Sequence, residues 1–71
     1  MSTVWSGSKP EQCDICKKPI TTVFIDGNTS FGGWANMCPD CHSQYGKGLG
    51  TGKGQKYNLE ATTKQFVKIG G

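Results

Sequence analysis

Cys13-Asp-Ile-Cys16 and Cys38-Pro-Asp-Cys41 are the two stretches that decide how this chain folds. Each is a pair of cysteines with two residues between them, and residues 17–37 separate the pairs, which is close to the spacing of structural zinc sites. The short gap lets the backbone turn so that both sulfurs of a pair reach one tetrahedral ion at about 2.3 Å, and the long gap has room for a hairpin. We therefore predict that Cys13, Cys16, Cys38 and Cys41 bind one structural Zn²⁺.

The length of the chain explains why a metal is needed. With 71 residues it forms one small domain, and below roughly 70–80 residues a hydrophobic core rarely contributes more than about 3–5 kcal/mol. No apolar segment near the N-terminus has the pattern of an export signal, and no apolar run approaches membrane-spanning length. We therefore expect a chain that is made and kept in the cytoplasm, where paired cysteines are metal ligands more often than disulfides.

Other uses of the same cysteines have weaker support. Two disulfides and a redox-active pair are the alternatives, but no βαβ pattern surrounds either pair. Cys38-Pro-Asp-Cys41-His42 also matches the haem-attachment pattern, without the export signal or enclosing helices that a haem protein needs. His42 is an alternative ligand, but adjacent residues rarely both face one ion, so we interpret it as a partly exposed neighbour of the site. We interpret Asp14 and Asp40 as turn formers or solvated charges, because thiolate sites prefer soft donors.

Local patterns predict the elements around the cysteines. Residues 21–26 are rich in β-branched and aromatic side chains, and Asp26-Gly27-Asn28 has strong turn chemistry. Pro39 suits the first position of a helix, and Gly46 suits its end. Apolar residues alternate in the C-terminal part, as in half-buried strands. We therefore expect a strand over residues 21–26, a turn at 26–28, a return over 34–37, a helix over 39–45 and a hairpin of 55–60 with 64–69.

Glycine occupies every even position from 46 to 54. If this stretch is extended, all its glycines lie on one bare face that can dock flat against another backbone. The alternative is a flexible linker, because ordering glycine has a high entropic cost. The predicted partner-binding residues are therefore Gly46, Gly48, Gly50, Gly52 and Gly54, with Lys47 and Lys53 between them.

The aromatic residues have two interpretations. They form a stacking platform for RNA bases, with lysines beside it for the phosphates, or they are the core of a chain that has few Leu and Ile residues. We favour the core, which would consist of Phe24, Phe31, Trp34, Tyr57 and Phe66. The chain has no arginine, which argues against sequence-specific nucleic-acid binding.

The charge is uneven along the chain. The formal net charge of +3 falls to about +1 when four thiolates and one Zn²⁺ are counted. Residues 1–41 are then acidic and residues 42–71 basic, since five of the eight lysines lie in the second part. One histidine and five scattered acids offer no nucleophile with a base, and the glycine run lacks the spacing of a phosphate loop. We therefore expect neither enzymatic activity nor a small-molecule substrate.

Several segments together resemble a family of small zinc-ribbon proteins encoded by tailed bacteriophages. They are Cys13-Asp-Ile-Cys16, Phe24-Ile-Asp-Gly27, Phe31-Gly-Gly-Trp34, Met37-Cys-Pro-Asp-Cys41-His42 and the run from Tyr45 through the glycines to Tyr57. The resemblance covers residues 13–57, and the glycine run is its most specific part. It implies a phage setting, in which small non-enzymatic proteins serve as decoration or cement on capsids.

These observations predict a small β-rich domain stapled by a metal, either a zinc ribbon or a treble-clef-like variant, with a C-terminal β-hairpin. We expect an N-terminal arm (residues 1–11), a zinc-ribbon module (12–45), a glycine-rich extended arm (46–54) and the hairpin (55–71). The expected function is a structural interaction module of a phage virion, made in the host cytoplasm, that binds neighbouring structural protein through its arms. The alternative is a zinc-ribbon protein that binds nucleic acid or regulates transcription.

Overall fold

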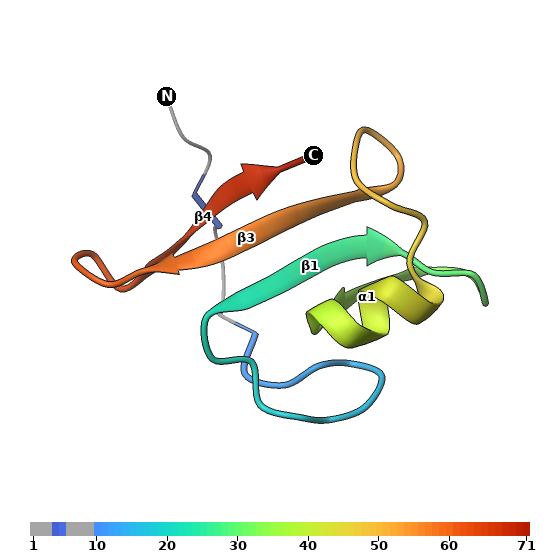
Figure 1. Ribbon diagram of the computed structural model, residues 1–71, viewed down its shortest axis with the longest axis horizontal. Helices are drawn as coiled ribbons and strands as arrows, with labels where there is room; N and C mark the ends of the chain where they lie inside the picture. The colour runs from blue at the N-terminus through green and yellow to red at the C-terminus, as the bar shows by residue number, and fades with distance from the viewer. Residues whose placement is uncertain (1–3, 6–9) are drawn as a thin grey trace.

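The computed structural model describes residues 4–5 and 10–71, which form one four-stranded antiparallel sheet with a short helix on one face (Figure 1). The strand order is β2-β1-β3-β4. The small β-rich fold expected from the sequence is therefore confirmed. The elements in chain order are β1 (Val23–Asn28), β2 (Trp34–Met37), α1 (Pro39–Tyr45), β3 (Gly54–Glu60) and β4 (Gln65–Gly70).

The first hairpin turns later than the sequence predicted. Asp26-Gly27-Asn28 was expected to be the turn, but it continues β1 and pairs with β2. Gly27 lies at a close approach, because a Cβ at this position would be 3.1 Å from the Lys53 carbonyl oxygen and 3.2 Å from Met37 Cε, which is tighter than usual packing. The turn instead follows Thr29, whose buried hydroxyl donates hydrogen bonds to the carbonyl oxygens of Gly33 (2.9 Å) and Gly32 (3.1 Å).

The helix has the bounds that its proline and glycine predicted. Cys38 is the N-cap, Pro39 occupies the first turn and Gly46 follows the last helical residue. A side chain at Gly46 would collide with the ring and the carbonyl oxygen of His42, so glycine is required where the chain leaves the helix. No helix in the described part of the chain is long and apolar enough to cross a membrane.

The sheet separates two small cores. Met37 pairs with Ile25 and is buried with Cys13 and Cys41 on the face that α1 covers. The neighbour of Ile25, Phe24, points to the opposite face, because side chains alternate along a strand. There it forms the aromatic core, stacked on Tyr57 at 5.1 Å between ring centroids and edge-on to Phe66 at 4.8 Å.

The prediction of the aromatic core was wrong for two residues and missed a third. Phe31 and Trp34 are 64% and 51% exposed, because they flank the hairpin turn at the end of the sheet. Trp5 packs edge-on against Phe24 and Tyr57 instead. Its backbone amide donates to the Phe66 carbonyl oxygen, and the preceding Val4 bridges Val67 of β4. Residues 4–5 of the expected arm are therefore part of the fold, whereas its residues 1–3 and 6–9 lie outside the described residues.

The glycine run is a folded loop, so the expectation of an extended arm is wrong. Gly48, Gly50 and Gly52 have positive φ angles of 87°, 127° and 76°, a conformation that favours glycine. The Gly50 amide donates to the Gly54 carbonyl oxygen at 2.8 Å, and the Gly54 amide donates back to the Gly50 carbonyl oxygen at 3.0 Å, which closes a turn between them. The even spacing of the glycines thus supplies turns, and no bare face with all five glycines exists.

We predict that Gly54→Ala destabilises the folded protein by about 1–3 kcal/mol, the usual cost of overpacking a buried position. The added Cβ would lie 2.9 Å from the Gly48 carbonyl oxygen and 3.4 Å from the Cα of Gly27 on β1. Urea unfolding of the metal-loaded protein measures the change. The control is Gly52→Asn, since position 52 is open and asparagine tolerates positive φ. Equal stability of wild type and Gly54→Ala would contradict the packing described for the loop.

Candidate metal centre

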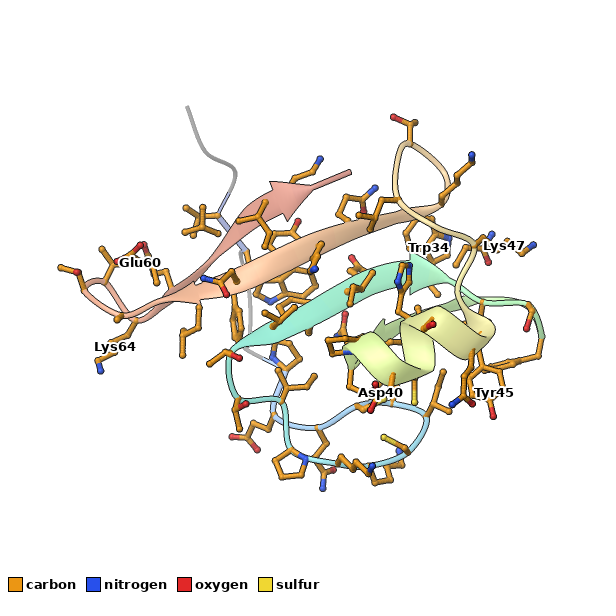
Figure 2. All side chains as sticks on the ribbon, viewed as in Figure 1. Trp34, Asp40, Tyr45, Lys47, Glu60 and Lys64 are labelled. Atoms are coloured by element: carbon orange, nitrogen blue, oxygen red, sulfur yellow. The ribbon has the colours of Figure 1, made fainter. Side chains whose placement is uncertain are left out.

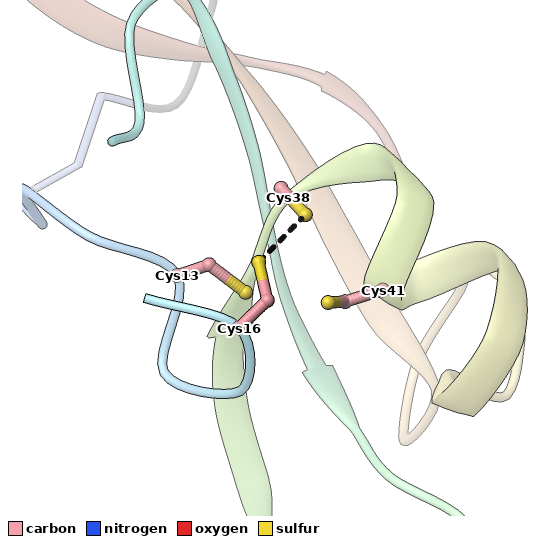
Figure 3. A group of neighbouring side chains, drawn as sticks. All are labelled: Cys13, Cys16, Cys38 and Cys41. Atoms are coloured by element: carbon pink, nitrogen blue, oxygen red, sulfur yellow. Dashed lines mark hydrogen bonds between the residues drawn. The ribbon is translucent and has the colours of Figure 1, made fainter. Parts of the chain in front are cut away.

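The first cysteine pair lies in a tight loop, which we call the first cysteine loop (residues 12–19). The Cys13 amide donates to the Lys18 carbonyl oxygen at 2.9 Å, and the Lys17 amide donates back to the Cys13 carbonyl oxygen at 3.0 Å. Lys17 has a positive φ of 66°, which lets the chain reverse directly after Cys16. The loop therefore holds the sulfurs of Cys13 and Cys16 on its inner side (Figure 3).

The second pair is positioned by the start of α1. Cys38 joins β2 to the helix, and its carbonyl oxygen accepts the His42 amide at 2.9 Å, which closes the first helical turn. Cys41 lies in that turn and is buried against Met37. Because three positions are almost one helical turn, the side chains of Cys38 and Cys41 emerge on the same side of the chain.

Asp14 fastens the first cysteine loop to β2. The Asp14 amide donates to the Asn36 carbonyl oxygen at 2.9 Å, and the Asn36 amide donates to Asp14 Oδ2, also at 2.9 Å. This reciprocal pair covers the free edge of β2, which would otherwise expose unpaired backbone groups. The sequence interpretation of Asp14 as a turn former or solvated charge missed this role, because nothing near Asp14 in the sequence indicates its partner.

The four sulfurs converge on one point. The Sγ atoms of Cys13, Cys16, Cys38 and Cys41 all lie within 4.8 Å of one another, and those of Cys16 and Cys38 are 3.7 Å apart (Figure 3). For a tetrahedral ion with bonds of about 2.3 Å, neighbouring sulfurs are about 3.8 Å apart. All four cysteines are free thiols and none is disulfide-bonded. The predicted ligand set therefore has the arrangement needed to bind a single metal ion.

The surroundings of the sulfurs favour ionisation at one of them. Burial by itself would raise the pKa of the Cys13 thiol, but backbone hydrogen bonds from Cys16, Cys38 and Ile15 lower it from 9.0 to about 6. The bond from the Ile15 amide to Cys13 Sγ measures 3.4 Å. Burial raises the pKa of Cys41, and its contacts with the other thiols raise it further. Four thiolates so close together need a cation to offset their repulsion, and a bound metal supplies it.

The centre is closed on one side and open on the other. Cys13 and Cys41 are buried, whereas Cys38 is half-buried and Cys16 is exposed. A hollow in the surface beside the exposed sulfurs is lined by Ile15, Cys16, Cys38 and Tyr45, among other residues. The thiols of Cys16 and Cys38 are thus within reach of solvent, while Cys13 and Cys41 anchor the candidate site to the core.

His42 is placed beside the site but serves the glycine loop. Among the described residues, the group that can hold a metal consists of the four cysteines and does not include His42. Its Nε2 lies 3.0 Å from the Gly48 carbonyl oxygen, so the ring nitrogen donates to that oxygen. The histidine therefore ties the loop to the helix that carries Cys41.

Not all of the residues predicted to bind a partner lie at the surface. Lys47 and Lys53 are exposed, but Gly54 is buried, and Gly46 lies against the ring of His42. Their proposed role in binding stays a prediction. The physical reason for the prediction changes. The glycines shape the loop, and the two lysines are exposed side chains on the loop that could contact a partner.

We predict that chelation unfolds residues 12–45. Metal binding in small cysteine domains contributes about 10–16 kcal/mol at neutral pH, which exceeds the contribution of a core of this size. Removing the metal should therefore abolish α1 and the β1–β2 hairpin, and one equivalent of Zn²⁺ should restore them. Two-dimensional NMR before and after strong chelation measures this. Dispersed, unchanged spectra from a sample without metal would sink the prediction.

We also predict that His42→Ala leaves one metal per chain and loosens the glycine loop. The substitution removes the bond to the Gly48 carbonyl oxygen and no ligand. Elemental analysis should give an unchanged metal content, while the amides of Gly50 and Gly54 should exchange with solvent faster. His42→Gln, which keeps a donor, is the matched control. Loss of metal from His42→Ala together with unchanged amide exchange would show that His42 is a ligand after all.

Comparisons with known proteins do not identify a relative of this chain, so the function of the cysteines is inferred from their geometry. No protein-family model matches the chain, and no curated protein or solved structure shows significant similarity to it. The firm conclusion is therefore chemical: four free cysteines in a small antiparallel β domain are positioned to bind one metal ion.

Proposed function

We propose that this protein is a non-enzymatic interaction module whose fold is held by one structural Zn²⁺. The observation that carries the proposal is the convergence of four thiols from a tight loop and a helix start within 4.8 Å. Thiolates select soft or borderline metals, and a tetrahedral set of four is typical of structural zinc. The order of cysteine loop, β-hairpin and helix supports the treble-clef-like variant over a simple zinc ribbon.

A structural role for the metal follows from the donor set. Four thiolates complete a tetrahedral shell, so no position remains for a water molecule or a substrate. Zinc has no redox chemistry of its own, and its contribution is to join residues 12–19 to the start of α1. The metal thus folds the domain, and binding is left to the surface.

The setting that we propose is a phage virion, in which the module binds a neighbouring structural protein. Its support is the resemblance of residues 13–57 to small zinc-ribbon proteins of tailed bacteriophages. A loop held in one conformation by His42 and by the bonds between Gly50 and Gly54 loses little entropy on binding, which suits a contact surface. Lys47 and Lys53 on this loop are the side chains that we expect to contact the partner.

We predict that mass spectrometry of purified particles detects this chain at a constant copy number. The particles come from the phage whose genome carries the sequence, and cross-linking within them should connect Lys47 or Lys53 to a structural protein. The chain should stay with the particles through density-gradient purification. Its absence from the particles, with the chain found instead in the lysate of infected cells, would overturn the virion role and leave the zinc site unaffected.

A further inference from the structure

Two aromatic rings are exposed at the end of the sheet. Phe31 is 64% and Tyr45 is 37% exposed, and their ring centroids are 5.8 Å apart at an angle of 64°. Trp34 is also exposed, but it lies on the opposite face of the sheet, because Met37 and Ala35 of the same strand point toward the cysteines. Phe31 and Tyr45 therefore form a separate pair, which we call the aromatic pair.

The aromatic pair is held by rigid backbone. The Ser30 amide donates to the Tyr45 carbonyl oxygen at 2.7 Å, which connects the hairpin turn to the end of α1. Thr29 closes the turn through its buried hydroxyl and bridges Gly46 just after the helix. The hydrogen bonds hold the turn at both ends, and the phenyl ring of Phe31 is exposed. The ring therefore contributes little to the stability of the fold. Its exposure is therefore better explained by binding.

The chain segments that carry the aromatic pair contain only positive charges. Residues 27–34 and 42–59 contain three lysines and no aspartate or glutamate. Lys47 follows Tyr45 by two residues, and the Lys53 carbonyl oxygen accepts the Asn28 amide at 2.9 Å, so both lysines belong to this end of the molecule. Figure 2 shows Tyr45 and Lys47 at one end, with Glu60 and Lys64 at the other. Asp14 and Asp40 lie outside these segments, but Asp40 lines the same surface hollow as Tyr45, together with Lys18.

This combination fits one class of ligand better than the others. Stacking on an aromatic ring requires an exposed ring face, and single-stranded nucleic acid offers such a face at every base and a phosphate beside it. A duplex hides its bases, and an apolar protein surface requires a continuous apolar patch, whereas Phe31 is flanked by Ser30 and Gly32. The absence of arginine argues against recognition of particular base edges.

We propose that the aromatic pair, Phe31 and Tyr45, with Lys47 and Lys53, binds single-stranded nucleic acid without sequence preference. A base stacks on Phe31, Tyr45 supports the ring from the side, and the lysines contact the flanking phosphates. This binding site does not depend on the virion role proposed above, although both proposals assign Lys47 and Lys53 to the ligand. With two phosphate contacts the binding is weak, and the slope of log K against log salt concentration is about −1.4.

The test is a fluorescence-anisotropy titration of a labelled 12-nucleotide oligothymidine with the zinc-loaded protein at several salt concentrations. Phe31→Ala should weaken binding about tenfold, which corresponds to about 1.4 kcal/mol and lies within the range for one stacked base. Lys47→Gln with Lys53→Gln should weaken binding at low salt and bring the salt slope close to zero. Zinc content and circular dichroism should be unchanged in every variant, since all three side chains are exposed.

Two control variants remove an exposed apolar side chain and a lysine charge outside the proposed binding site. Ile69→Ala removes an apolar side chain that is 58% exposed on β4, and Lys64→Gln removes a charge at the other end of the molecule (Figure 2). Both should bind the oligonucleotide like wild type. The proposal is overturned if wild type does not bind at low salt, if duplex of equal length binds as tightly, or if Phe31→Ala and Ile69→Ala lose the same affinity. If no variant binds the oligonucleotide and Phe31→Ala loses the cross-link to a structural protein, the surface binds a protein partner instead.

Discussion

The closure of four sulfurs around one point is the constraint on which the rest of this structure depends. Cys13 and Cys16 come from a loop with no regular structure of its own, and Cys38 and Cys41 come from a helix of seven residues. Neither element is stable alone, since short helices are marginal in water. Joining them fixes the path of the β1–β2 hairpin between them, and the sheet then builds outward from β1.

The sheet extends this constraint to a second core that contains no metal ligand. β1 places the buried Ile25 on the face with the cysteines and Phe24 in the aromatic core, so one strand has a buried side chain on each face of the sheet. β3 and β4 add Tyr57 and Phe66, and Trp5 closes that cluster from the sheet edge. A chain of this size thus divides a small apolar content between two thin layers, which is why neither layer alone would hold the fold.

The sequence predicted those parts of the fold that depend on local chemistry. The ligand set followed from cysteine spacing, and the bounds of α1 followed from Pro39 and Gly46, because caps act on neighbouring residues. The turn was misplaced because Gly27 lies at a close approach to Met37 and Lys53, which are distant in the sequence, and not in a turn. Contacts with distant residues also explain why the conformation of the glycine loop was mispredicted. Phe31 was expected to be buried because it is aromatic, but its position in a turn exposes it. Such contacts between distant residues leave no local pattern to read.

One tie within the structure has a thermodynamic consequence. His42 directly follows the ligand Cys41 and holds Gly48, and Gly46 bridges Thr29 at the base of the turn that carries Phe31. The candidate metal centre and the exposed end therefore share one connected segment. If the metal and a ligand of the exposed end each order this segment, their binding is positively cooperative, and each raises the affinity for the other by the same factor. The protein would then hold its metal most tightly when its surface is occupied.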